Sequence, residues 1–242
     1  MYVISIINQK GGVGKTTTAH NLAAGLRLQK KKVLLLDLDA QCNLTLLQRA
    51  NNNTHTIYDV LTGKTKLRDA IQDDFVAGSK NLILLQSKAG AEQILKYVLQ
   101  SAKDYDYVII DTPPALGIIT INALTASDSI IITSTADLLP IQGLNDLYKT
   151  VQTVKKNSNP DLKILGILIT RFNKRTVLGK TMLKSLTDIA AKIGTKVFNT
   201  EIRDSIAIKE AQAKQTDIFS YSRYSTAGRD YKNLTTEILE MM

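Results

Sequence analysis

The chain has 242 residues, of which 44% are hydrophobic and 22% are charged, and its formal net charge is +9. This length suits one α/β domain, and no apolar run reaches the roughly 18 residues that a membrane span requires. The N-terminus lacks the basic-then-apolar layout of a signal peptide. The single cysteine, Cys42, excludes an intramolecular disulfide and is typical of a reducing compartment. We therefore expect a soluble cytoplasmic protein with a single domain over residues 1–242.

Short β-branched runs alternate with stretches of helical period along the chain. The pattern predicts strands at 3–7, 33–37, 82–85, 107–111, 129–133 and 164–169, and near 196–198. It predicts helices at 15–29, 91–102, 118–126 and 177–193, from Pro140 onward, and near 206–214 and 227–240. Such alternation favours a single doubly wound, mostly parallel sheet with helices on both faces. Ligands of such sheets bind at the carboxyl ends of the strands.

A glycine-rich loop separates the first predicted strand from the first helix, as in a P-loop, and it reads Lys10, Gly11, Gly12, Val13, Gly14, Lys15, Thr16 and Thr17. Glycines let backbone N–H groups converge on phosphate oxygens, and the helix N-terminus adds partial positive charge. We expect Lys15 to reach the β- and γ-phosphates and the Thr16 hydroxyl to bind Mg²⁺. The alternative, a glycine-rich turn without a nucleotide, is disfavoured by the strand-loop-helix context.

The loop departs from the usual P-loop pattern at its start, where Gln9 stands in place of glycine and is followed by a second lysine, Lys10. Two lysines around one phosphate site repel each other unless a highly charged anion lies between them. Lys10 has two interpretations: a side chain that points into water, or a functional group.

Acidic residues follow two further predicted strands. Asp37 and Asp39 are two positions apart, so in extended geometry they share one face. Asp111 ends an apolar strand, which is the usual place of the carboxylate that holds Mg²⁺ in P-loop enzymes. An aspartate at a strand end is more often a helix cap or a turn former, but three of them beside a P-loop favour a shared site.

The positive charge is concentrated in residues 171–200, which hold seven basic residues against the single acid Asp188: Arg171, Lys174, Arg175, Lys180, Lys184, Lys192 and Lys196. A basic surface of this kind can bind a polyanion without sequence preference. A solvated basic helix is the alternative interpretation.

Four stretches resemble the ParA/MinD family of deviant Walker A ATPases, and within it the small partition proteins of the ParA type. They are NQKGGVGKTTTAHNLA (8–23), VLLLDLDAQCNLT (33–45), YDYVIIDTPPALGIITINALTASD (105–128) and IRDSIAIKEAQA (202–213). The resemblance implies a P-loop NTPase fold with ATP and Mg²⁺ as cofactors. It further implies that Lys10 reaches the phosphates of a partner in an ATP-dependent homodimer, that Asp39 orients the attacking water, and that Asp111 holds Mg²⁺ through water. Residues 112–117 would sense the γ-phosphate.

The same resemblance implies binding to non-specific DNA through the basic stretch, with Arg175 as the best candidate contact, followed by Lys174, Lys180 and Lys184. It implies a weak ATPase that a centromere-binding activator of the ParB type stimulates, and segregation of plasmid or chromosomal DNA on the nucleoid. The chain lacks the N-terminal helix-turn-helix of larger partition ATPases, so we do not expect operator binding.

Three other functions remain as alternatives. A MinD-like membrane regulator needs a basic amphipathic C-terminal helix, whereas residues 233–242 hold two acids and no base. Iron–sulfur relatives need more cysteines than Cys42, which we interpret as a small packing residue. A metabolic P-loop ligase would need a small-substrate pocket that the sequence does not identify.

Overall fold

The computed structural model describes residues 1–242 except 52–53, 88–90, 136–139 and 175. Its strands form one sheet in the order β3-β4-β2-β5-β1-β6-β7, in which every neighbouring pair is parallel except β3 and β4. The strands are β1 (Tyr2–Ile7), β2 (Val33–Asp37), β3 (Ile71–Gln72), β4 (Phe75–Val76), β5 (Tyr107–Asp111), β6 (Ser129–Thr135) and β7 (Lys163–Thr170). The doubly wound fold expected from the sequence is therefore confirmed.

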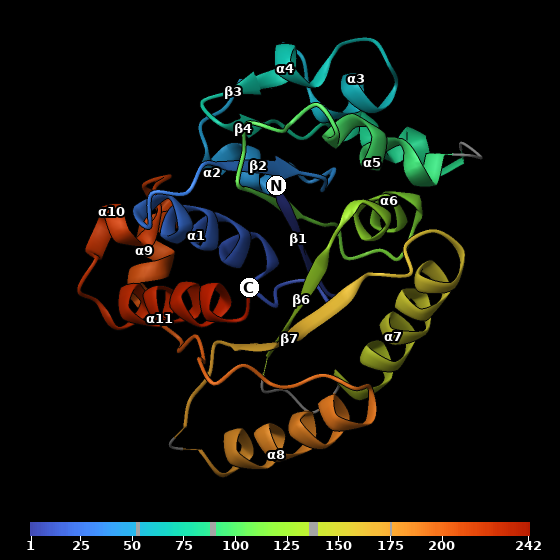
Figure 1. The fold of residues 1–242 in the computed structure, drawn as a ribbon. Helices are drawn as coiled ribbons and strands as arrows, with labels where there is room; N and C mark the ends of the chain where they lie inside the picture. The colour runs from blue at the N-terminus through green and yellow to red at the C-terminus, as the bar shows by residue number, and fades with distance from the viewer. Residues whose placement is uncertain (52–53, 88–90, 136–139, 175) are drawn as a thin grey trace.

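Helices cover both faces of this sheet (Figure 1). One face packs against α1 (Lys15–Leu28), α2 (Asn43–Leu47), α9 (Ile206–Ala213), α10 (Ile218–Ser222) and α11 (Thr226–Glu240). The other face packs against α3 (Ile57–Leu61), α4 (Leu67–Ala70), α5 (Ile94–Leu99), α6 (Ile118–Ala126), α7 (Pro140–Asn157) and α8 (Val177–Lys192). Because both faces are covered, the central strands β1, β2 and β5 read as almost continuous apolar runs.

Two of the predicted strands are wrong. Residues 82–85 lie in a 3₁₀ helix, η1 (Lys80–Ser87), and a second short 3₁₀ turn, η2 (Ala91–Gln93), precedes α5. In η1, Leu82 and Leu85 are buried while Ile83 and Leu84 are about 60% exposed, so the apolar positions follow a helical spacing of three and not strand alternation. Residues 196–198 form only an isolated bridge, between Val197 and Ile167.

The antiparallel pair β3–β4 is an edge hairpin that the sequence analysis missed. Its turn residues Asp73 and Asp74 both adopt left-handed backbone conformations, with φ of 48° and 60°, which a tight hairpin turn requires. Each strand is only two residues long. A pattern of alternating residues cannot be recognised over such a length.

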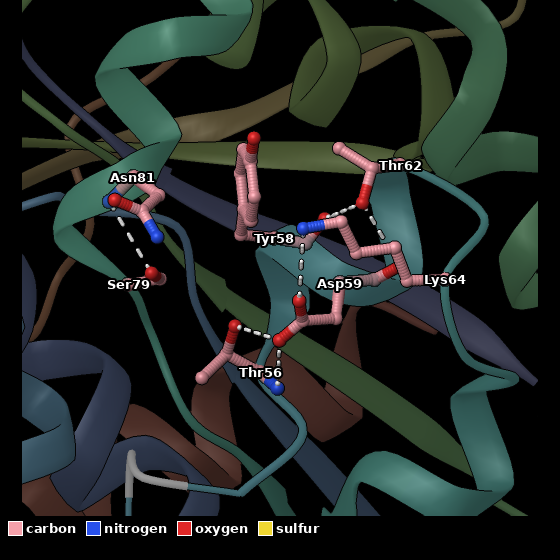
Figure 2. Close-up of polar contacts among 7 residues, drawn as sticks. All are labelled: Thr56, Tyr58, Asp59, Thr62, Lys64, Ser79 and Asn81. Carbon is pink, nitrogen blue, oxygen red and sulfur yellow. Dashed lines mark hydrogen bonds and ion pairs between the residues drawn. The ribbon is translucent and has the colours of Figure 1, made fainter.

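The short helix α3 begins at a polar cap, shown in Figure 2. The carboxylate of Asp59 accepts hydrogen bonds from the backbone N–H of Thr56 (3.0 Å) and from its hydroxyl (2.8 Å). The Lys64 ammonium lies 4.0 Å from Asp59 and 5.2 Å from the ring centre of Tyr58. These contacts fix the start of a helix that is too short to be stable alone.

The terminal helix α11 packs against α1, and its buried side chains include Tyr231, Leu234 and Ile238. The interpretation of residues 233–242 as the end of a packed helix is thus confirmed. Among the described residues, no helix is both long and apolar enough to cross a membrane.

Candidate nucleotide site

The glycine-rich loop joins β1 to α1 at the carboxyl edge of the sheet. Gly12 and Gly14 have φ of 74° and 80°, a left-handed conformation in which a side chain would be strained. Asn8 holds the start of the loop: its amide donates to the Thr133 carbonyl (2.5 Å), and its oxygen accepts the Lys10 N–H (2.9 Å). The loop is therefore held open by glycine conformations and by a buried asparagine.

The two lysines of the loop occupy different surroundings. Lys15 is buried, and its ammonium donates to the carbonyl of Lys10 at 3.0 Å. Burial lowers the pKa of Lys15, and the carboxylates of Asp111 and Asp39 oppose that shift. The side chain of Lys10 is exposed. Only Lys15 thus belongs to the interior of the site.

A cavity of about 640 Å³ opens over the loop, which is a size typical of small-molecule sites. Its walls are the loop, the segment after β2 and a C-terminal segment of the chain. The lining residues include Gly11, Gly12, Gly14, Lys15, Thr16, Thr17, Asp39, Pro114, Thr170, Arg171, Ile202, Arg203, Asp204, Ser205, Ile208, Lys209, Gln212 and Tyr231. All of the predicted loop contacts except Lys10 and Val13 therefore face one cavity.

Asp111 lies at the end of β5 and is completely buried. Among the described residues, neither of its carboxylate oxygens has a well-formed hydrogen bond. Burial and the nearby Asp37 carboxylate raise the pKa of Asp111 well above its ordinary value, and the Thr16 hydroxyl opposes that shift. A buried acid without donors is costly unless a cation or its water shell supplies the missing partners.

The donor set around Asp111 fits Mg²⁺. Among the described residues there is no cluster of three or more His, Cys, Asp or Glu side chains that could cage a metal. Mg²⁺ in nucleotide sites is typically bound by one or two protein groups, with phosphate oxygens and water completing its octahedron. The Thr16 hydroxyl in the cavity and Asp111 behind it supply such a set.

Asp37 and Asp39 were expected to share one face of an extended strand. The strand β2 ends at Asp37, so the alternation of an extended chain does not continue to Asp39. Asp37 is fully buried and hydrogen-bonded to Thr45, whereas Asp39 is half-buried and lines the cavity. The three aspartates therefore differ in their surroundings. Asp39 faces the cavity, Asp111 lies behind it, and Asp37 is hydrogen-bonded to Thr45 within the protein.

The segment at 112–117, which the resemblance implies to be a sensor of the γ-phosphate, contributes one residue to the lining of the cavity. The Thr112 hydroxyl donates to the Ile6 carbonyl at 2.7 Å, which ties the segment to β1. Pro114 lines the cavity, and α6 begins directly after Gly117. The segment therefore connects the end of β5 to the start of α6 beside the cavity.

The far wall of the cavity was missed by the sequence analysis, which assigned no contact to residues 202–213. Here Gln212 donates to the Thr17 hydroxyl at 2.8 Å. Arg171 donates to the carbonyl of Gly12 at 3.2 Å, from a left-handed backbone with φ of 52°. Arg171 had been counted with the basic stretch. Its position directly after β7, at the carboxyl edge of the sheet, is the signal that could have placed it here.

The remaining basic residues lie outside the cavity. Lys180 and Lys184 are exposed on α8, four positions apart and hence on one side of the helix. Lys174 forms an ion pair with Glu201, with 2.5 Å between Nζ and Oε2. Arg175 lies outside the described residues. The structure therefore presents Lys180 and Lys184 to solvent and engages Lys174 within the protein.

The chain is similar to known proteins over most of its length. Residues 1–164 match the family model described as an AAA domain, AAA_31. The chain is 37% identical to the sporulation initiation inhibitor protein Soj of Bacillus subtilis, over 98% of this chain and 97% of Soj. It is 36% identical to the chromosome-partitioning ATPase Soj of Treponema pallidum, over 96% of this chain and 95% of that protein.

Two solved structures are similar over almost the whole chain. Cobyrinic acid a,c-diamide synthase from Mycobacterium smegmatis, with bound ATP analogue and magnesium, superposes with a TM-score of 0.85 at 30% identity and covers 99% of this chain and 95% of its own. A putative plasmid partition protein from Borrelia burgdorferi B31 bound to AMPPNP superposes with a TM-score of 0.86 at 26% identity, over 100% and 99%.

Proposed function

The chain belongs to the ParA/MinD family of P-loop ATPases, and from that premise we propose that it is a partition ATPase that dimerises on ATP. In this proposal the cavity holds ATP and Mg²⁺. The similar synthase structure contains an ATP analogue and magnesium, and the similar plasmid partition structure contains AMPPNP. The ATP-bound dimer binds DNA without sequence preference. An activator of the ParB type then stimulates hydrolysis and releases the dimer from the nucleoid, so that plasmid or chromosomal DNA is moved.

The observation that carries this proposal is the contrast between Lys15 and Lys10. Lys15 is buried in the loop and lines the cavity, where its ammonium can bind the phosphates of its own subunit. Lys10 is exposed and absent from the lining, so it lies at the surface of the loop, where in this proposal it meets the second subunit. Each nucleotide would then be held by one lysine from each subunit, and the repulsion between the cations would be offset by the phosphates between them.

Within one subunit, the residues around the cavity would have separate roles in hydrolysis. Thr16 and Asp111 would hold Mg²⁺, which when bound neutralises charge on the β- and γ-phosphates. Asp39, facing the cavity, would orient the attacking water. Positioning of this kind accounts for most of the rate in phosphoryl transfer. We expect weak turnover until an activator completes the site.

Dimerisation provides the test of this proposal. With AMPPNP and Mg²⁺, light scattering should show that the wild-type mass doubles, whereas Lys10→Gln should bind AMPPNP with little loss and remain monomeric. Lys15→Gln should lose nucleotide binding itself, because it removes the buried cation of the site. The matched control is Lys31→Gln, which alters an exposed lysine after α1 and should dimerise normally. A Lys10→Gln protein that dimerises like the wild type would refute the assigned role.

The membrane alternative receives no support from α11. Its apolar side chains Tyr231, Leu234 and Ile238 are buried against the core and are therefore not available to a lipid surface. We expect no sedimentation with anionic vesicles in the presence of ATP. Clear sedimentation would favour a MinD-like regulator.

A further inference from the structure

Asp37 has no place in the proposed chemistry, yet its carboxylate is completely buried beside the site. It accepts three hydrogen bonds. The backbone N–H of Asp39 donates to Oδ1 at 3.0 Å, while the backbone N–H and the hydroxyl of Thr45 donate to Oδ2 at 2.8 and 2.7 Å. Bonds to an ionised carboxylate are about twice as strong as neutral ones.

Thr45 links this carboxylate to a third part of the chain. Its hydroxyl donates to Asp37 and accepts the backbone N–H of Gly78 at 2.8 Å. Gly78 follows β4 and packs so closely that a Cβ on it would lie 2.9 Å from Asp37 Cγ. The end of β2, the first turn of α2 and the segment after β4 therefore meet at one buried carboxylate.

The loop between these contacts carries Asp39. Residues 38–44 leave β2 at Asp37 and return to the same carboxylate at Thr45, so both ends of the loop are fixed by one side chain. Within the loop, the Gln41 N–H donates to Asp39 Oδ1 at 3.0 Å, and Asp39 lines the cavity. The direction in which Asp39 points is thus set by the contacts of Asp37.

We propose that Asp37 and Thr45 are positioning residues for Asp39, which hold the 38–44 loop so that the Asp39 carboxylate faces the phosphate end of the cavity. The inference rests on the proposed function, in which Asp39 orients the attacking water. Nucleotide binding depends on the glycine-rich loop and on Lys15, which lie between β1 and the start of α1 and outside the 38–44 loop. Loosening this network should therefore slow hydrolysis and leave nucleotide affinity intact.

The decisive comparison is Thr45→Val against Thr45→Ser. Valine matches the shape of threonine but removes one of the three hydrogen bonds to Asp37 and the hydroxyl that accepts the Gly78 N–H, whereas serine keeps that hydroxyl. A displacement of a reacting group by about 1 Å can cost about 100-fold in rate. We expect Thr45→Val to lower kcat for phosphate release by about 10- to 100-fold with unchanged affinity for AMPPNP, and Thr45→Ser to restore most of kcat.

A second variant and a control make the result unambiguous. Gly78→Ala keeps every hydrogen-bonding group but pushes a methyl group against Asp37, and it should also lower kcat selectively. Asp39→Ala, measured in parallel, should abolish turnover. If Asp39→Ala hydrolyses ATP normally, the proposed role of Asp39 fails, and this inference fails with it.

The positioning proposal alone is overturned if Asp39→Ala is inactive while Thr45→Val keeps the wild-type kcat. It is also overturned if kcat and AMPPNP affinity fall together, or if Thr45→Val and Gly78→Ala are both unfolded by circular dichroism. In those two cases the network stabilises the fold and does not act specifically on Asp39.

Discussion

At the scale of single residues, burial decides which charged groups are available for chemistry. Lys15 and Asp111 are both buried, and each is shifted toward its neutral form by desolvation. Their opposite charges partly compensate each other, since Asp111 raises the pKa of Lys15. A triphosphate with its metal ion would complete this compensation, because it adds anions beside the lysine and a cation beside the acid.

His20 offers a test of burial outside the site. It lies on α1 at 6% exposure, and burial lowers its pKa, as does Arg27, while Asp217 opposes the shift. The folded state therefore binds a proton less readily than the unfolded chain. Neutral His20 therefore contributes fully to the free energy of unfolding above its unfolded pKa of about 6.5, and this contribution is lost as the pH falls below that value.

Urea unfolding between pH 5 and 7.5 measures this effect. Burial raises the pKa of Asp37 to about 6, which changes stability in the opposite sense, so the variants are compared with one another. Relative to His20→Gln, the free energy of unfolding of the wild-type protein should fall toward pH 5 below about pH 6.5. The chain has one other histidine, the exposed His55, and His55→Gln serves as the control that keeps the decrease. An unchanged slope in His20→Gln would contradict the assignment.

At the scale of elements, α8 is amphipathic, with a buried apolar side and an exposed basic side. Met182, Leu186 and Ala190 are buried at a spacing of four, while Lys180 and Lys184 are exposed. The Thr176 hydroxyl caps the helix by accepting the Gly179 N–H at 3.0 Å. The helix therefore presents its lysines on the side away from its buried residues, which is the arrangement that the proposed DNA contact requires.

The salt dependence of DNA binding tests this surface. The double variant Lys180→Ala/Lys184→Ala should weaken binding to unrelated DNA and reduce the slope of log K against log salt by about 2. Lys174→Ala should have a smaller effect, because Lys174 is paired with Glu201. Lys31→Ala, which alters an exposed lysine just before β2, is the control. If the double variant and this control give the same slope, α8 does not contact DNA.

The elements that the sequence predicts at their observed bounds are apolar segments with clear ends: two strands that each end in an aspartate, and a helix that follows Pro113 and Pro114. Strands β2 and β5 and helix α6 were predicted at the bounds that the structure shows. The wrong or missed predictions concern segments whose secondary structure depends on tertiary contacts. The 3₁₀ helix at Lys80–Ser87 has too short an apolar run to separate it from a strand, and the β3–β4 hairpin depends on the backbone of Asp73 and Asp74.

In the site, too, some residues can be predicted from the sequence and others depend on tertiary packing. The loop residues were predicted from a motif that fixes their geometry, and all but Lys10 and Val13 line the cavity. Residues 202–213 could not be placed, because they reach the cavity only through the packing of α9 and α11 on α1. The distinct surroundings of Asp37 and Asp39 depend on where β2 stops, which residue spacing does not show.

At the scale of the whole molecule, the nucleotide cavity and the basic helix lie on different parts of one sheet. The cavity opens at the carboxyl edge near α1, while α8 covers the opposite face beside β7 (Figure 1). One subunit can therefore hold a nucleotide and expose Lys180 and Lys184 at the same time. The assignment of residues 1–242 to one domain stays a prediction. A dimer would place two basic helices on one assembly, and such bivalence raises affinity for a long polyanion without new contacts.

The most direct test of this account is a mobility shift of the protein on unrelated double-stranded DNA, compared with ATP and Mg²⁺, with ADP and Mg²⁺, and without nucleotide. We predict binding with ATP and Mg²⁺, little or none in the other two conditions, and loss of binding when magnesium is chelated. Lys10→Gln should show no ATP-dependent shift, because it cannot form the dimer. Equal binding in all three conditions, or none in any, would contradict an ATP-switched partition ATPase.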